Sequence, residues 1–176
     1  AKGLLSLGAI AYEPIWLFYR GSEIEDHVRP IIQVLKNPIS IGNEGSGTLV
    51  KAQQLLKING MTPDPSTMFK LRQDEAIAAL KKGEIKAILV VENYNSAIIQ
   101  ELIKDKDLLL LDFVRAKAYS KLLRYIEVLH VPMGGFDLVR NYPDHDIQLL
   151  STTTNLIIED DLHPAIQMLF MQASSA

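Results

Sequence analysis

The chain has 176 residues, of which 48% are hydrophobic and 22% charged, and its formal net charge is −3. This composition is ordinary for one globular domain, or two small lobes, with a real hydrophobic core. Acidic and basic residues are mixed along the chain, which argues against a nucleic-acid binder with its usual basic face. Because there is no cysteine, thiol catalysis, disulfides and zinc sites built on Cys/His spacing are excluded.

The two ends carry no targeting signal. No run is apolar and long enough to span a bilayer, and no charged start leads into an apolar stretch with a cleavage site. The sequence begins almost directly with a strand-like segment and stops just after a helical pattern. We therefore expect it to be part of a longer protein.

In chain order, apolar residues first predict strands over 4–10 and 15–19, with a break at Tyr12-Glu13-Pro14, because proline donates no ladder hydrogen bond. Pro30 limits the helical spacing of 24–35 to short pieces. A buried strand over 38–42 leads into a glycine-rich turn and a helix that stops at Asn59-Gly60.

The same alternation continues to the end of the chain. A strand over 67–71 precedes a helix with acids at its start, Gln73-Asp74-Glu75, and bases at its end, Lys81-Lys82-Gly83. The near-continuous apolar run 85–91 predicts a strand covered on both faces. The remaining expected elements are helices over 95–104, 114–124 and 164–171 and extended segments over 108–113, 127–131, 147–150 and 155–158. This order predicts an α/β fold with a mostly parallel sheet and helices on both faces.

The glycine-rich turn, Gly42 to Thr48, is the main candidate site. Glycine allows a sharp turn and close approach of a ligand, Ser46 or Thr48 can cap the helix, and the free N–H groups of its first turn favour a carboxylate or phosphate. No lysine follows Gly47, which excludes a P-loop, and the spacing fits neither the dinucleotide fingerprint nor a nucleophile elbow. The alternative is a plain helix cap with no ligand.

Two further polar segments could contribute to the same pocket. Tyr12 and Glu13 could stack on a ligand and accept from an ammonium, or form a surface turn. Asn93-Tyr94-Asn95-Ser96 follows the buried strand, and ligands of open α/β sheets lie beyond the carboxyl ends of strands; the alternative is that Asn95 or Ser96 only caps the next helix. Asp144-His145-Asp146 is expected to be a solvated loop.

Several stretches, in this order, resemble the TAXI family of TRAP-transporter solute receptors (NMT1-like). They are 12–20 (YEPIWLFYR), 39–48 (ISIGNEGSGT), 75–85 (EAIAALKKGEI), 131–138 (VPMGGFDL) and 162–165 (LHPA). The last two resemble the longer, membrane-anchored branch of the family. The chain departs from the family at Lys86, where aspartate is usual, and at 93–96, where a proline-containing turn is common.

The resemblance implies a type 2 periplasmic binding protein fold, a bacterial receptor in the periplasm or on the extracytoplasmic face of the membrane, and no catalysis, metal or cofactor. Its partners would be a small organic anion, such as a dicarboxylate or glutamate, and the TRAP permease subunits, with no nucleic acid and with any membrane anchor outside this chain. The ligand-binding residues it implies are Tyr12, Glu13, Gly45, Ser46, Gly47, Thr48, Asn93, Tyr94, Asn95 and Ser96.

Because the family's first lobe precedes the tyrosine-glutamate stretch, we expect 1–20 to be crossing strands from that lobe. Residues 21–150 would form the second lobe and 151–176 a return segment. Two other classes stay open: the effector-binding domain of a LysR-type transcription regulator, and an enzyme of the same fold that uses the glycine turn for phosphate. Neither paired carboxylates nor a Ser-His-Asp order supports the enzyme.

Overall fold

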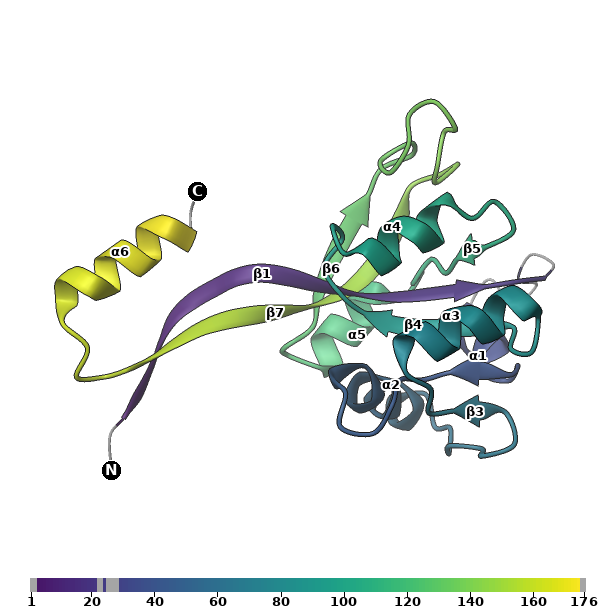
Figure 1. The fold of residues 1–176 in the computed structure, drawn as a ribbon, viewed down its shortest axis with the longest axis horizontal. Coiled ribbons are helices and arrows are strands. Elements are labelled where there is room, and N and C mark those ends of the chain that lie inside the picture. The colour runs from purple at the N-terminus through teal and green to yellow at the C-terminus, as the bar shows by residue number, and fades with distance from the viewer. Residues whose placement is uncertain (1–2, 22–23, 25–28, 175–176) are drawn as a thin grey trace.

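The computed structural model describes every residue except 1–2, 22–23, 25–28 and 175–176. An α/β lobe forms most of the molecule, and a long two-stranded ribbon leads away from it to an isolated helix (Figure 1). The ribbon consists of β1 (Leu4–Tyr19) and β7 (Ile147–Glu159), and the helix is α6 (Pro164–Ser174). Leu4 pairs with Glu159 at the outer end of the ribbon, and Ile15 pairs with Leu150 at the lobe.

The described strands form one seven-stranded mixed sheet in the order β3-β2-β4-β1-β7-β6, with β5 pairing with the inner end of β1. The strands not yet placed are β2 (Ile39–Ser40), β3 (Met68–Phe69), β4 (Ala87–Val91), β5 (Leu109–Leu110) and β6 (Glu127–Val131). β2 is parallel to β3 and β4, and both β4 and β5 are antiparallel to β1. The lobe therefore has parallel strands on both sides of β1, which runs in the opposite direction.

β4 lies at the centre of the lobe. Four consecutive residues, Ala87 to Val90, are buried although they point alternately to opposite faces, so both faces of the sheet are covered. The helices are α1 (Pro30–Leu35), α2 (Gly47–Ile58), α3 (Gln73–Lys82), α4 (Ala97–Lys104) and α5 (Ala116–Leu122). Their apolar residues and those of β1 and β4 form one core, which confirms the predicted α/β architecture. The sheet is mixed and not mostly parallel, because only β2 pairs in parallel with its neighbours and every pair made by β1 or β7 is antiparallel.

The predicted break at Tyr12-Glu13-Pro14 is wrong, because β1 runs through it as one strand of 16 residues. The N–H and C=O groups of one strand residue point to the same neighbouring strand, and the Pro14 carbonyl accepts from Glu92 N–H, just beyond β4. The missing N–H of Pro14 would therefore face the β4 side, so the ladder with β7 loses no bond. The extended segments expected over 147–150 and 155–158 also belong to a single strand, β7, which pairs with β1 along this length.

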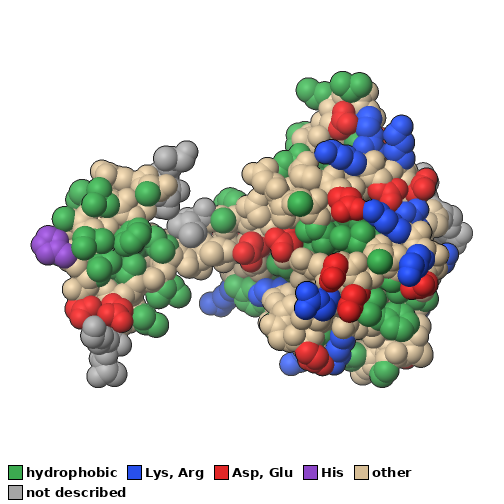
Figure 2. Space-filling model, viewed as in Figure 1, with side chains coloured by type: hydrophobic (Ala, Val, Ile, Leu, Met, Phe, Trp, Pro, Cys, Tyr) green, Lys and Arg blue, Asp and Glu red, His purple; other side chains and the backbone are tan. Residues whose placement is uncertain are grey.

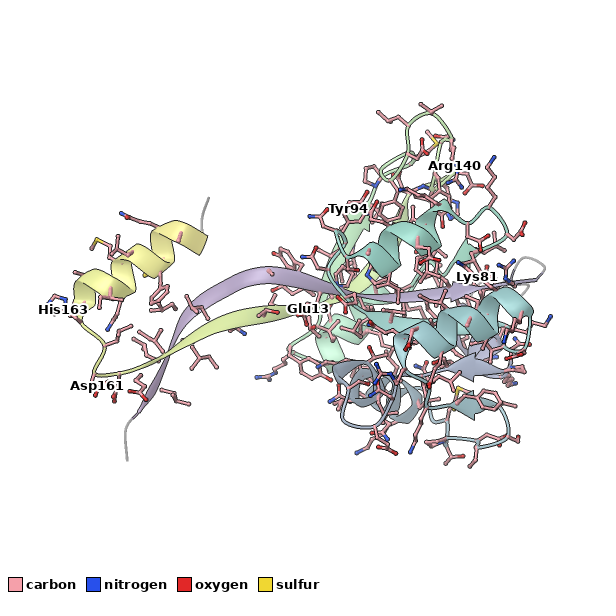
Figure 3. The ribbon with its side chains drawn as sticks, in the orientation of Figure 1. Glu13, Lys81, Tyr94, Arg140, Asp161 and His163 are labelled. Atoms are coloured by element: carbon pink, nitrogen blue, oxygen red, sulfur yellow. The ribbon has the colours of Figure 1, made fainter. Side chains whose placement is uncertain are left out.

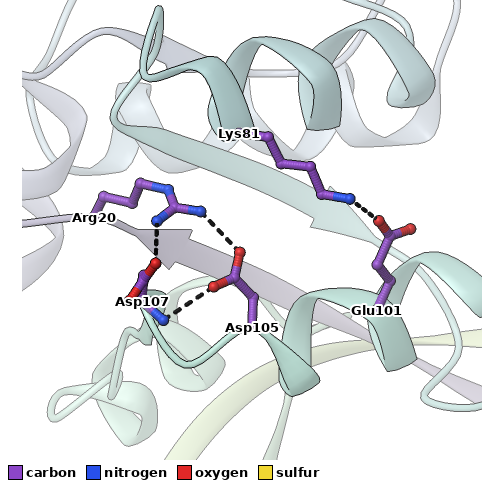
Figure 4. Close-up of polar contacts among 5 residues, drawn as sticks. All are labelled: Arg20, Lys81, Glu101, Asp105 and Asp107. Carbon is purple, nitrogen blue, oxygen red and sulfur yellow. Dashed lines mark hydrogen bonds and ion pairs between the residues drawn. The ribbon is translucent and has the colours of Figure 1, made fainter.

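Ion pairs join the inner end of β1 to the helices of the lobe (Figure 4). Arg20 binds Asp105 at 2.8 Å and Asp107 at 3.3 Å, just after α4. Lys81 near the end of α3 binds Glu101 of α4. These contacts fix α4 relative to the strand that continues into the ribbon.

The far end of the molecule is unusually apolar. Side chains of α6 form an exposed apolar cluster that the space-filling view shows at the end of the ribbon (Figure 2). Its members are Ile166, Met168, Leu169, Phe170 and Met171. Within the described part of the chain, no helix has the length and hydropathy needed to cross a membrane.

Candidate functional site

A cavity of about 460 Å³ opens between the glycine-rich turn after β2 and the start of α3 after β3. Both segments follow the carboxyl ends of parallel strands, where α/β sheets usually bind ligands. β4 forms the floor of the cavity. Its polar walls come from Ser40, Asn43, Ser46 and Thr48 on one side and from Arg72, Gln73 and Asp74 on the other.

The turn itself is possible only with glycine at Gly42. This residue has a φ of 87°, in the left-handed region that favours glycine. A Cβ on Gly42 would lie 2.8 Å from the Ser46 hydroxyl oxygen and 2.8 Å from Cβ of Thr48. Gly45 is also left-handed, with a φ of 79°, but a Cβ there would point into open space. The turn thus folds tightly back on the start of α2.

Ser46 is the N-cap of α2. Its hydroxyl donates to the Asn43 carbonyl at 2.7 Å and accepts from the N–H of Leu49 at 3.1 Å. Among the described residues, the N–H groups of Gly47 and Thr48 have no hydrogen-bond partner. Two donors at the positive end of a 12-residue helix are therefore available to an anion.

Thr48 connects the turn to the sheet. Its hydroxyl oxygen accepts from the N–H of Val91 at the end of β4, at 3.1 Å. This contact uses an acceptor lone pair, so the hydroxyl hydrogen can still be donated to another group. Ser46 and Thr48 both line the cavity, whereas their neighbours Gly45 and Gly47 belong to the turn without lining it.

Arg72 is a site residue that the sequence interpretation missed. It is the N-cap of α3, its backbone N–H donates to the Glu75 carboxylate at 3.0 Å, and its side chain is 72% exposed. Its Nε lies 3.4 Å from Asp74, so the guanidinium also has terminal N–H donors for other groups. The signal was present in the sequence: Arg72 follows the predicted strand 67–71, whose carboxyl end meets that of 38–42 in a parallel sheet.

The predicted pair Tyr12 and Glu13 lies on the ribbon, outside the cavity lining. Figure 3 shows Glu13 where β1 enters the lobe. Its carboxylate accepts from the Thr154 hydroxyl at 2.8 Å, and Tyr12 is half exposed. Burial lowers the pKa of Lys51 on α2, and the negative charge of Glu13 opposes that shift. Glu13 therefore lies within electrostatic reach of α2.

The segment Asn93 to Ser96 also lies outside the cavity lining. Asn93 accepts from the N–H of Asn95 at 2.8 Å, and the Ser96 hydroxyl accepts from Ile99 N–H at 3.4 Å as the N-cap of α4. Tyr94 stacks on Phe136 with ring centroids 5.6 Å apart (Figure 3 shows its position). These groups have local structural roles, and their contact with a ligand stays a prediction.

The lobe has parallel strands on both sides of the reversed strand β1 and a cavity at the carboxyl ends of β2 and β3, and it belongs to the class of periplasmic-binding-protein-like domains. Comparison with family models gives the particular family. Residues 5–164 match the NMT1-like family, and the chain belongs to it. No curated protein matches the chain.

The solved structures to which the chain is similar share little sequence identity with it. A periplasmic binding protein of an ABC transporter from Brucella ovis, with glutathione bound, is 15% identical at a TM-score of 0.51, over 98% of this chain and 41% of that protein. Full-length BenM is 10% identical at a TM-score of 0.49, over 99% of this chain and 45% of BenM. The arginine-, lysine-, histidine-binding protein ArtJ from Geobacillus stearothermophilus is 11% identical at a TM-score of 0.48, over 97% of this chain and 55% of ArtJ. The chain thus spans about half the length of these proteins.

Proposed function

We propose that this chain is the ligand-binding lobe of an extracytoplasmic receptor for a small organic anion. Residues 21–150 would form the lobe, 1–20 and 151–176 would cross to a second lobe that closes the pocket, and a TRAP-type permease would receive the ligand. The proposed role includes no chemical step. Its location would be the periplasm or the outer face of the membrane, with any membrane anchor outside this chain.

The observation that carries the proposal is the concentration of anion-binding groups on one cavity. The free N–H group of Thr48, which lines the cavity, and that of its neighbour Gly47 lie at the start of α2, and the guanidinium of Arg72 lies at the start of α3. The helix dipoles of α2 and α3 add positive potential at the same place. A carboxylate could accept from the amides and from the guanidinium, which are strong charge-assisted bonds.

The negative charge of Asp74 favours some anionic ligands over others. Its carboxylate lines the same cavity beside Arg72, so the wall carries one positive and one negative side chain. A dicarboxylate would face repulsion from Asp74, whereas an amino acid such as glutamate offers an ammonium that Asp74 can accept from. We therefore rank amino acids above dicarboxylates. Tyr12, Glu13 and the segment Asn93 to Ser96 would contact the ligand only when the second lobe closes.

The test is a calorimetric titration of the chain with glutamate, succinate and the uncharged diamide of succinate, backed by thermal unfolding. A ligand at about 100 times its dissociation constant should add roughly 2.7 kcal/mol to the free energy of unfolding. Arg72→Gln should weaken binding about tenfold or more, because a charge-assisted hydrogen bond contributes about 1.5–3 kcal/mol.

Lys70→Gln is the matched control. Lys70 is an exposed base two residues before Arg72, pairs with Glu44 at 2.6 Å and does not line the cavity. It should leave affinity unchanged. Equal losses in the two variants would mean that general positive charge, and not this site, attracts the ligand. Binding of the diamide as tight as that of the acids would contradict an anion site.

A further inference from the structure

A second cavity, of about 400 Å³, is lined by the inner end of β1, by β5 and by the start of β7. Tyr19 lines it and pairs with Ala87, the first residue of β4, and Leu109, the first residue of β5, lines it as well. The first cavity lies instead beyond Ser40, where β2 ends. The two cavities share no lining residue, and the proposed anion site does not account for the second one.

The charge of the second cavity is negative. Asp112 and Asp144 both line it, and among its described lining residues there is neither lysine nor arginine. Asp112 uses one oxygen to accept from the N–H of Gln148 at 2.8 Å, which leaves the other oxygen for a further partner. Asp144 lies 2.6 Å from Nδ1 of His145, an exposed imidazole that is charged only when protonated.

Two tyrosines and an apolar floor complete the wall. Tyr19 and Tyr142 line the cavity together with aliphatic side chains such as Leu110 and Ile147. Burial raises the pKa of Tyr142 to about 12, and the nearby Arg140 lowers it while Tyr19 and Asp144 raise it. The Tyr142 phenol is therefore neutral at physiological pH. Arg140 lies over the Tyr142 ring, 5.4 Å from its centroid, but does not line the cavity.

We propose that this second cavity binds a small organic cation, an ammonium attached to an apolar or aromatic body. The Asp112 and Asp144 carboxylates supply the charge, the tyrosine rings supply faces that attract cations, and the aliphatic floor accommodates the body. The chemistry is opposite to that of the first cavity, where helix N-termini and Arg72 favour an anion. One lobe would then carry two sites of opposite charge preference.

The test compares phenethylammonium with phenethyl alcohol, which has the same body without the charge. Calorimetric titration of the chain measures the affinity for each compound. We expect saturable binding of the ammonium, at least tenfold weaker binding of the alcohol, and weaker ammonium binding as salt concentration rises. Amide shifts in NMR spectra should centre on Tyr19 and Tyr142.

The double variant Asp112→Asn, Asp144→Asn should weaken ammonium binding at least tenfold. Both charges are removed, while the new amide oxygen at position 112 can still accept from the N–H of Gln148. The matched control is Asp146→Asn, in the same loop but outside this cavity lining; it should bind as the unaltered chain does. Thermal unfolding verifies that each variant is folded. Equal binding of ammonium and alcohol, an unaffected double variant, or shifts centred on the glycine turn would each overturn the proposal.

Discussion

Gly42 holds a left-handed backbone at a position where a side chain has no room. Gly42→Ala should lower the free energy of unfolding by about 2–4 kcal/mol, because the strain of φ at 87° adds to contacts of 2.8 Å with Ser46 and Thr48. Urea denaturation measures this loss. Gly45→Ala is the control: its φ is similar but its Cβ would meet nothing, so about 1–2 kcal/mol is expected. Equal costs would show that crowding at the start of α2 is unimportant.

At the scale of single residues, the sequence identified the turn but not its full set of partners. Gly42, Ser46 and Thr48 were recognisable because glycines followed by a capping serine between an apolar strand and a helix indicate a tight turn at a helix N-terminus. Arg72 was missed because the turn that shares the cavity with it precedes it by about 30 residues of sequence, and no local pattern links the two. Ser96 caps α4, which is the alternative that the sequence had allowed, and Asn93 accepts from the N–H of Asn95.

Thr48 at the start of α2 forms a side-chain hydrogen bond with the end of β4. Thr48→Val keeps the shape but leaves the N–H of Val91 without its acceptor, so the free energy of unfolding should fall by about 1–3 kcal/mol. Thr48→Ser retains the hydroxyl and should cost less. Chemical denaturation compares the two, and the Val91 amide proton should shift only in the valine variant. A smaller cost for valine than for serine would contradict this role.

Elements were predicted well where burial alone decides them. Apart from Lys86 the run 85–91 is apolar on both faces, as a covered central strand requires, and β4 occupies its last five residues. The helix α3 has acids in its first turn and lysines in its last, and its ends match the prediction. The expected break at Pro14 was wrong because the effect of a proline depends on which neighbouring strand its nitrogen faces. That direction depends on where β4 ends, and a local sequence pattern does not contain this information.

At the scale of the whole molecule, β1 has two different environments. Between Ile15 and Tyr19 it pairs with β4 inside the lobe, whereas from Leu4 to Glu13 only β7 pairs with it. Two-stranded ribbons are marginally stable in water. Amide hydrogen exchange should therefore be at least tenfold faster in the outer part of β1 than between Ile15 and Tyr19. Mass spectrometry of peptides from the two halves measures it, and β6 serves as the internal reference. Equal protection in both halves would contradict this description.

Leu4 pairs with Glu159, so the segment 4–159, which contains the ribbon and the lobe, begins and ends at neighbouring positions. Neighbouring strands are about 5 Å apart, so a surface loop of another protein would need to open by little more than that to accept the segment as an insertion. A fluorescent or enzymatic host could thus carry the lobe without a break in its own fold. A bend of the ribbon would then strain the host protein at the two positions where the segment is inserted.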